Sequence, residues 1–179
     1  MKIEKERLKN NSQRDKSSSP KTEKAVYCVL KKRGLVENEQ FEKQQPIFNI
    51  PFCKSNRHKV DLILKNDLGD KLYVEIKGEM TYLEVNKLRY LIDSTPYNFY
   101  ILQLTEIDWI KPFEKSSFKR KSLKSKDDFE KQIDELIGFV RGTISGGELS
   151  EKSRKRLNRY IRYRGSDIKR WIECNKNVE

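Results

Sequence analysis

The sequence predicts an α/β fold in which a helix, three strands, a second helix and a fourth strand follow one another over residues 20–105. Apolar residues recur at helical spacing in residues 20–35 and 82–94, and short runs of β-branched and aliphatic residues lie at 41–50, 59–65, 71–77 and 97–105. Because the last three of these elements alternate strand, helix and strand, we expect them to form a right-handed β-α-β crossover in a mixed sheet.

Residues 59–65 and 71–77 predict the arms of a β-hairpin, because residues 66–70 between them have turn chemistry and include a glycine. Pairing of Lys65 with Lys71 would fix the register. It places aliphatic pairs on one face: Leu64 with Leu72, Leu62 with Val74, and Val60 with Ile76. It places charged pairs on the other face: Asp61 opposite Glu75, and Lys59 opposite Lys77.

Two carboxylates in directly opposed positions repel each other, so the pairing of Asp61 with Glu75 needs a reason. A hard divalent cation is one reason, since Mg²⁺ is held by one or two carboxylates together with water and substrate phosphate. Lys77 projects from the same face as Glu75 and would place an ammonium beside that cation. The alternative is a half-exposed hairpin whose charged face is simply solvated.

An Asp on one strand followed by Glu75-Ile76-Lys77 on the next resembles the signature of the PD-(D/E)XK nuclease superfamily, with Val60 where the family often has proline. The resemblance covers residues 20–105 and implies a restriction-endonuclease-like α-β-β-β-α-β core. It implies that Asp61, Glu75 and the carbonyl of Ile76 bind Mg²⁺, with Mn²⁺ as a substitute, and that Lys77 positions the attacking water.

Many members of this superfamily begin with a helix that carries a glutamate facing the metal site. Glu23, in the first turn of the helix expected at residues 20–35, is similar to that residue and is the candidate third acid. Three later acids near the first strand remain alternatives: Glu37, Glu39 and Glu42.

The formal net charge of +12, from 39 Lys and Arg against 27 Asp and Glu, favours a polyanionic partner, and DNA is the partner that the resemblance implies. Candidate phosphate-binding residues lie in a loop before Asp61, in a serine-bearing basic segment and in a basic C-terminal helix with interleaved aromatics: Lys54, Arg57, Lys119, Arg120, Lys121, Arg154, Lys155, Arg159, Arg162 and Arg164. A solvated outer helix is the alternative for the last group, and an anionic membrane surface is a lesser one.

Four regions are expected: a disordered basic arm at 1–19, the nuclease core at 20–110, a basic linker or loop at 111–126, and a helical extension at 127–179 packed on the core. Ser150 is the expected N-cap of the final helix. His58, the single histidine, is expected in a surface loop.

Several classes of protein are disfavoured. No apolar run approaches a membrane span, and the N-terminus lacks the apolar stretch of a signal peptide. The odd, widely spaced cysteines Cys28, Cys53 and Cys174 favour a reduced, cytoplasmic protein. Cys53 and His58 lack the spacing of a zinc site, and no nucleotide-binding glycine motif indicates a small-molecule cofactor.

The sequence therefore predicts a Mg²⁺-dependent DNA endonuclease of the restriction, resolvase or recombination type. Since two duplex strands need two sites, a homodimer is the expected assembly. A nucleic-acid-binding module that keeps the fold without cleavage, and a protein-interaction domain, remain alternatives. The choices between DNA and RNA, and between endonuclease and exonuclease, stay open.

Overall fold

The computed structural model describes residues 20–48, 57–78, 80, 82–107, 120–123 and 125–160, which include four α-helices. The chain divides into two compact units, residues 1–35 and 36–179. The predicted arm at 1–19 lies outside the described residues.

The N-terminal unit contains helix α2 (Pro20–Lys32), as the apolar spacing predicts. Gly34 ends this helix with φ of +93°, a conformation that glycine adopts without strain. The amide of Gly34 donates to the carbonyl of Lys31, and that of Leu35 to the carbonyl of Leu30. These two bonds make a Schellman motif, which satisfies carbonyls that a helix end would otherwise leave without partners.

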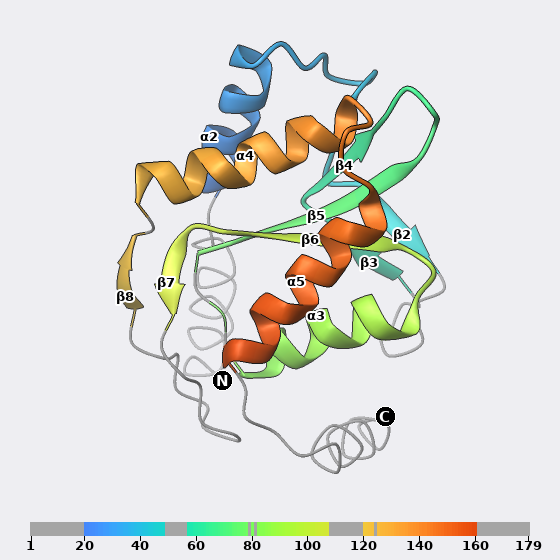
Figure 1. The fold of residues 1–179 in the computed structure, drawn as a ribbon. Helices are drawn as coiled ribbons and strands as arrows, with labels where there is room; N and C mark the ends of the chain where they lie inside the picture. Colours follow the sequence, from blue (N-terminus) through green and yellow to red (C-terminus); the bar gives the residue numbers. More distant parts are fainter. Residues whose placement is uncertain are drawn as a thin grey trace, which may run out of the picture. The chain divides into compact units, whose positions relative to one another are not determined.

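The second unit is built on a mixed four-stranded sheet in the order β1-β4-β5-β6 (Figure 1). Its strands are β1 (Phe41–Lys43), β4 (Leu62–Lys65), β5 (Lys71–Lys77) and β6 (Asn98–Gln103). The β1–β4 and β4–β5 pairs are antiparallel, and β5–β6 is parallel. Leu62 pairs with Val74, Leu64 with Leu72 and Lys65 with Lys71, which confirms the predicted register over β4.

The predicted register is wrong below Leu62, because the chain bends at Asp61 and leaves the β4–β5 ladder. The strand expected over residues 59–65 is divided, because Lys59 ends β3 (Arg57–Lys59) and β4 starts only at Leu62. Strand β3 extends into the expected loop and pairs with β2 (Pro46–Phe48) in a separate ladder. Lys59 is therefore opposite Pro46 and not Lys77. A matching break at Gln44, with φ of +49°, separates β1 from β2, as Pro46 suggests.

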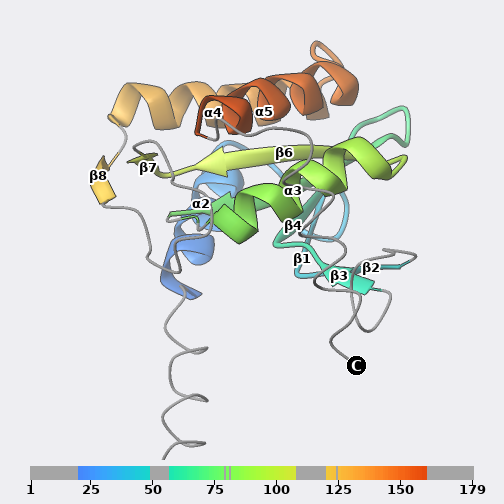
Figure 2. The same cartoon turned by 90° about the horizontal axis from the view of Figure 1, so that it is seen from below.

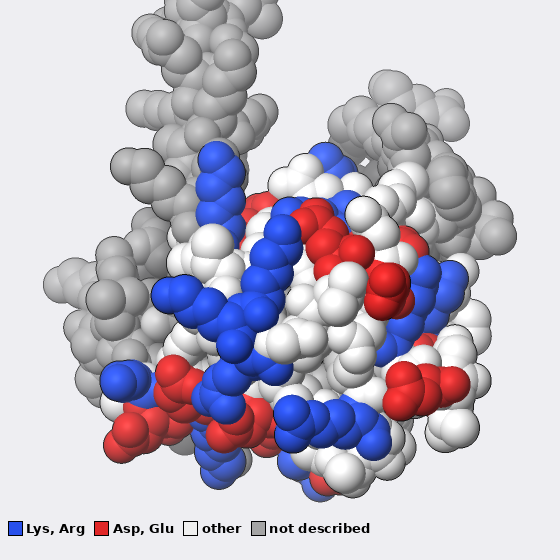
Figure 3. Space-filling model, turned by 90° about the horizontal axis from the view of Figure 1, so that it is seen from above, with Lys and Arg blue, Asp and Glu red and all other residues white. Residues whose placement is uncertain are grey.

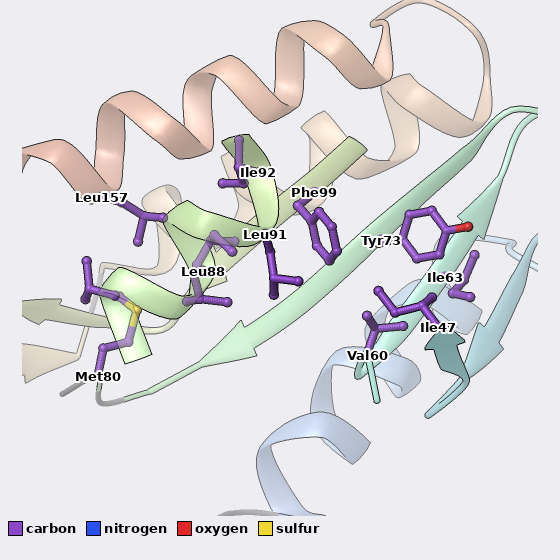
Figure 4. Close-up of a cluster of buried hydrophobic side chains, with 12 residues drawn as sticks. Ile47, Val60, Ile63, Tyr73, Met80, Leu88, Leu91, Ile92, Phe99 and Leu157 are labelled. Carbon is purple, nitrogen blue, oxygen red and sulfur yellow. The ribbon is translucent and has the colours of Figure 1, made fainter. Parts of the chain in front are cut away.

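Helix α3 (Tyr82–Ser94) connects β5 to β6 and packs on one side of the sheet, while the two later helices lie on the other side (Figure 2). A buried apolar cluster lies between α3 and the sheet (Figure 4). Tyr73 and Ile63 belong to this cluster, and so does Val60, which the register prediction assigns to the opposite face with Leu62. The bend at Asp61 accounts for the difference, because it directs the Val60 side chain to the face of the sheet that α3 covers.

Two further helices follow, α4 (Lys126–Val140) and α5 (Gly146–Tyr160). Ser125 caps α4 through its hydroxyl, which accepts from the amide of Asp128 at 3.1 Å. Ser150 is not the N-cap of the final helix, because α5 starts one turn earlier. There Ser145 Oγ accepts from the amide of Glu148 at 3.2 Å. Strands β7 (Thr105–Ile107) and β8 (Arg120–Leu123) form an antiparallel pair, and β8 lies in the segment 111–126 that was expected to be a linker or loop.

Side chains from α4 and α5 occupy the open edge of β6. Gln132 bonds both backbone groups of Gln103, at 2.9 and 2.8 Å, and Ser153 Oγ accepts from the amide of Ile101 at 3.0 Å. Arg156 donates to the carbonyl of Ile101, and Ser150 Oγ to that of Phe99. An edge strand otherwise presents unpaired groups to other chains, so these bonds close the sheet.

Replacing Gln132 with Leu should leave two buried backbone groups of β6 without partners. We expect the free energy of unfolding in urea to fall by about 2–4 kcal/mol, since each unsatisfied buried group costs about 1–3 kcal/mol. The neighbouring exposed Lys131→Ala is the control and should change stability by less than about 0.5 kcal/mol. Equal effects of the two substitutions would contradict the edge-closing role.

Candidate active site

Asp61, Glu75 and Lys77 come together where the chain bends into β4 and β5 reaches its end. Asp61 Oδ2 accepts a hydrogen bond from the backbone amide of Ile76 at 2.8 Å. Lys77 Nζ lies 2.8 Å from Glu75 Oε2. Asp61 therefore contacts the backbone of β5 next to Glu75 through a side-chain bond, and not through the register pair expected.

Glu75 is buried, with 1% of its surface exposed, on the face of the hairpin expected to be charged. Because successive side chains of β5 point to opposite faces of the sheet, Glu75 lies on the same face as Tyr73, beneath α3. A carboxylate without water needs partners of opposite charge. The site is thus a buried group near the sheet end and not a solvated pair.

His58 provides the second partner of Glu75, and its placement corrects the prediction of a surface-loop histidine. It lies on β3, is buried, and brings Nε2 to 2.6 Å from Glu75 Oε1. The alternation of exposed Lys59 with buried His58 and Val60 is the signal that could have indicated this inward position. The expected single strand over residues 59–65 places the Lys59 side chain on the face of Glu75, so it gave no indication that His58 points toward the site.

The ionisation of Glu75 and Lys77 follows from their mutual contact. Burial alone would raise the pKa of Glu75, but the Lys77 ammonium and His58 outweigh it and lower that pKa from 4.5 to about 2. Burial alone would lower the pKa of Lys77, yet Glu75 and Asp61 raise it above its usual value. Lys77 is therefore an ammonium at neutral pH, and its chemistry is that of a cation and not of a base.

Glu84 is an acid near this site that the sequence did not suggest. It lies in the first turn of α3, a few residues after Lys77, and its charge contributes to the raised pKa of Lys77. Because the β5–α3 connection is short, an acid at the start of α3 stays close to the end of β5. Acidic residues occur in several of the helical segments of the sequence, and nothing in the spacing of these residues distinguishes Glu84 from the others.

The other candidates for the third acid are placed differently. Glu23 belongs to the N-terminal unit, and its role stays a prediction. Glu37 pairs with Lys43 at 2.5 Å, and Glu42 pairs with Lys65. The exposed Glu39 lies on the segment before β1.

The donor chemistry of the site suits a hard cation, since Asp61, Glu75 and the carbonyl of Ile76 offer oxygen ligands. Two carboxylates are enough for Mg²⁺, which keeps several waters and takes further ligands from substrate phosphate. Over residues 20–48, 57–78, 80, 82–107, 120–123 and 125–160, no group of three or more His, Cys, Asp or Glu is arranged to hold a metal. Any cation here would therefore depend on water and substrate for its remaining ligands.

The predicted phosphate-binding residues are only partly described. Lys54, Lys119, Arg162 and Arg164 lie outside the described residues, as do Cys53 and Cys174. The structure places four others on elements without describing their side chains: Arg57 on β3, Arg120 and Lys121 on β8, and Arg159 on α5.

Two predicted contacts on α5 differ in their surroundings. Arg154 is bound to Asp93 of α3 and to Glu151, each at 2.7 Å, so it joins α5 to α3. The Lys155 side chain is 71% exposed and lies 3.8 Å from Glu151. Lys155 is consequently the better candidate of the two for contact with a polyanion.

A polar hollow of about 340 Å³ lies between α4 and α5. It is lined by Asp128, Lys131, Gln132, Glu135, Lys152, Lys155 and Arg156. Its acids are engaged, since Glu135 accepts from Tyr100 at 2.6 Å and Asp128 from Ser125 at 2.9 Å. On the face drawn in Figure 3, Lys and Arg side chains are interspersed with Asp and Glu.

Comparison with protein-family models gives no match, and comparison with curated proteins gives none either. None of the helices in the described ranges combines the length and apolar character needed to cross a membrane.

The lowered pKa of Glu75 predicts a specific acid sensitivity. In the unfolded chain its carboxyl has its usual pKa of 4.5, so it binds protons more readily than in the folded protein, where the pKa is about 2. Its contribution to stability is therefore complete above pH 4.5 and is lost as pH falls toward 2. Urea denaturation at a series of pH values should show the free energy of unfolding declining through this window.

The matched variant is Glu75→Gln, which keeps the shape of the side chain and removes its titration. Whatever its stability at pH 7, this variant should show a shallower decline between pH 4.5 and 2. Parallel curves for the two proteins would contradict the pairing of Glu75 with Lys77 and His58.

Proposed function

We propose that this protein is a metal-dependent nuclease that hydrolyses phosphodiester bonds in DNA, and that it acts as an endonuclease of the PD-(D/E)XK type. The observation that carries the proposal is the convergence of Asp61, Glu75 and Lys77, with Glu75 buried and ionised. Buried ion pairs are poor sources of stability, whereas strongly shifted pKa values are concentrated at functional sites.

The order of elements supports a restriction-endonuclease-like core within this α/β fold. An antiparallel β4–β5 pair carries Asp61 and Glu75, and β5 continues through α3 to the parallel strand β6. In that arrangement the two acids and Lys77 stand at the end of a central strand.

The residues divide the chemistry between them. Asp61, Glu75 and the carbonyl of Ile76 would hold Mg²⁺, or Mn²⁺ in its place. The ion would supply Lewis-acid stabilisation of the charge that develops on the scissile phosphate. The Lys77 ammonium would orient the attacking water or neutralise a phosphate oxygen, and cleavage would proceed by in-line displacement at phosphorus. Because its pKa is raised, Lys77 acts by charge and hydrogen bonding.

A nucleic-acid-binding module that does not cleave is the second candidate. It is favoured by the two hydrogen-bonding partners, Lys77 and His58, that Glu75 already has, and by the small number of metal-binding side chains at the described part of the site. Such a module would use the exposed cations of α4 and α5 but would not require Asp61, Glu75 and Lys77 together. A protein-interaction domain would tolerate Asp61→Asn without loss of function.

The nuclease proposal predicts metal-dependent cleavage of supercoiled, linear, single-stranded or branched DNA. Lys77→Ala and Asp61→Asn should reduce the cleavage rate by about 100-fold or more, the effect typical of removing one electrostatic contact to the transition state. Lys71→Ala, at the other end of β5 and exposed, is the matched control and should cleave at the wild-type rate. Salt-sensitive binding without cuts in Mg²⁺ or Mn²⁺ would instead favour the non-cleaving module.

The exposed cations of the α4–α5 hollow should contribute to DNA affinity. We expect Lys155→Ala to weaken binding of a labelled duplex in fluorescence anisotropy and to reduce the slope of log affinity against log salt by about 1. Lys71→Ala again serves as the control, since it removes the same charge from the hairpin end. A Lys155→Ala slope equal to that of the control would exclude this surface from the interface.

A homodimer remains a prediction of the resemblance, because one site cuts one strand. Sedimentation of the protein with and without duplex DNA would test it.

A further inference from the structure

The single histidine of the chain is buried against the acid that the proposed function depends on most. His58 Nε2 and Glu75 Oε1 are 2.6 Å apart, and 9% and 2% of the two side chains are exposed. An ionised carboxylate can only accept, so His58 Nε2 carries the proton and donates it to Glu75. This contact is not part of the acid-and-lysine signature in the sequence.

Glu75 is held at both oxygens, and its two partners differ in stiffness. Lys77 reaches Oε2 with a flexible four-carbon side chain that is 22% exposed. His58 reaches Oε1 with a rigid ring on β3, where it is paired with Ile47 of the neighbouring strand. The ring is therefore the more fixed of the two contacts, and it ties the orientation of the carboxylate to the β2–β3 ladder.

The local chain geometry explains how the histidine reaches this position. The bend at Asp61 separates β3 from β4 and turns both His58 and Val60 inward beneath α3. Without the bend, a continuous strand would face Lys59 toward Glu75. The same bend thus delivers Asp61 to the amide of Ile76 and His58 to Glu75.

We propose that His58 is a positioning residue, which holds the Glu75 carboxylate through Oε1 so that its remaining lone pairs face a divalent cation shared with Asp61. This inference rests on the proposed function, since it concerns the same site. Hydrogen bonds to ligating carboxylates fix their orientation, and loss of such a partner typically lowers metal affinity by about 10–100-fold.

Binding of Mn²⁺ to the full-length protein, measured by isothermal titration calorimetry without DNA, tests this role apart from catalysis. His58→Gln keeps an amide N–H near the position of Nε2, whereas His58→Asn places its amide near that of Nδ1, too short to reach Glu75. We expect His58→Asn to weaken Mn²⁺ binding by about 10–100-fold and His58→Gln to stay within a few-fold of the wild type. Circular dichroism and thermal melting of each variant confirm that it is folded.

Other outcomes overturn the proposal in distinguishable ways. Equal Mn²⁺ affinity in the wild type and a folded His58→Asn would reduce His58 to a packing residue and leave the nuclease proposal intact. Tighter binding in His58→Asn would show that the imidazole competes with the cation for Glu75. A wild-type protein that binds no Mn²⁺, alone or with a duplex, would remove the metal from the proposed function and this inference with it.

Discussion

A carboxylate enclosed by a sheet and a helix needs polar partners, and Glu75 has the Lys77 ammonium on one side and the His58 ring N–H on the other. Most other features of the site follow from this requirement. Lys77 stays protonated because Glu75 and Asp61 surround it, and β3 must turn inward for its histidine to reach β5. The central sheet thus carries a polar site on the face that also holds the apolar cluster beneath α3.

The rest of the unit keeps this sheet closed and rigid. Apolar packing beneath α3 covers one face, and α4 buries a row of apolar side chains on the other side of β6. Side chains of α4 and α5 bond the open edge of β6, at a position where a further strand could otherwise add.

Much of the fold was predictable, because it depends on local patterns. The apolar spacing of α2 and α3 and the strand character of β5 and β6 locate the elements, and the glycine turn sets the register from Lys65 to Leu62. The predictions that were wrong concern features that depend on tertiary structure. No local rule requires the bend at Asp61, so the sequence placed Val60 on the opposite face of the sheet and His58 in a surface loop. The start of α5 was placed at Ser150 because Gly146 and Gly147 suggested a break.

The candidate site was predictable in its residues but not in its geometry. The spacing of Asp61, Glu75 and Lys77 suggested acids adjacent to a lysine, and the structure places these residues together. Their burial, the bond from Asp61 to the Ile76 amide, the contact of His58 with Glu75 and the charge of Glu84 near Lys77 could not be derived from spacing. They arise from residues distant in the sequence whose side chains meet only in the folded unit.

The central claim is that Asp61 and Glu75 together form a divalent-cation site. Anomalous diffraction from crystals of the protein grown with Mn²⁺ and a short DNA duplex tests it most directly. The account predicts a manganese peak within bonding distance of oxygens from both carboxylates, with a phosphate oxygen of the DNA beside it. Bound DNA with no peak there, or with manganese held only elsewhere while Glu75 stays paired to Lys77 and His58, would contradict it.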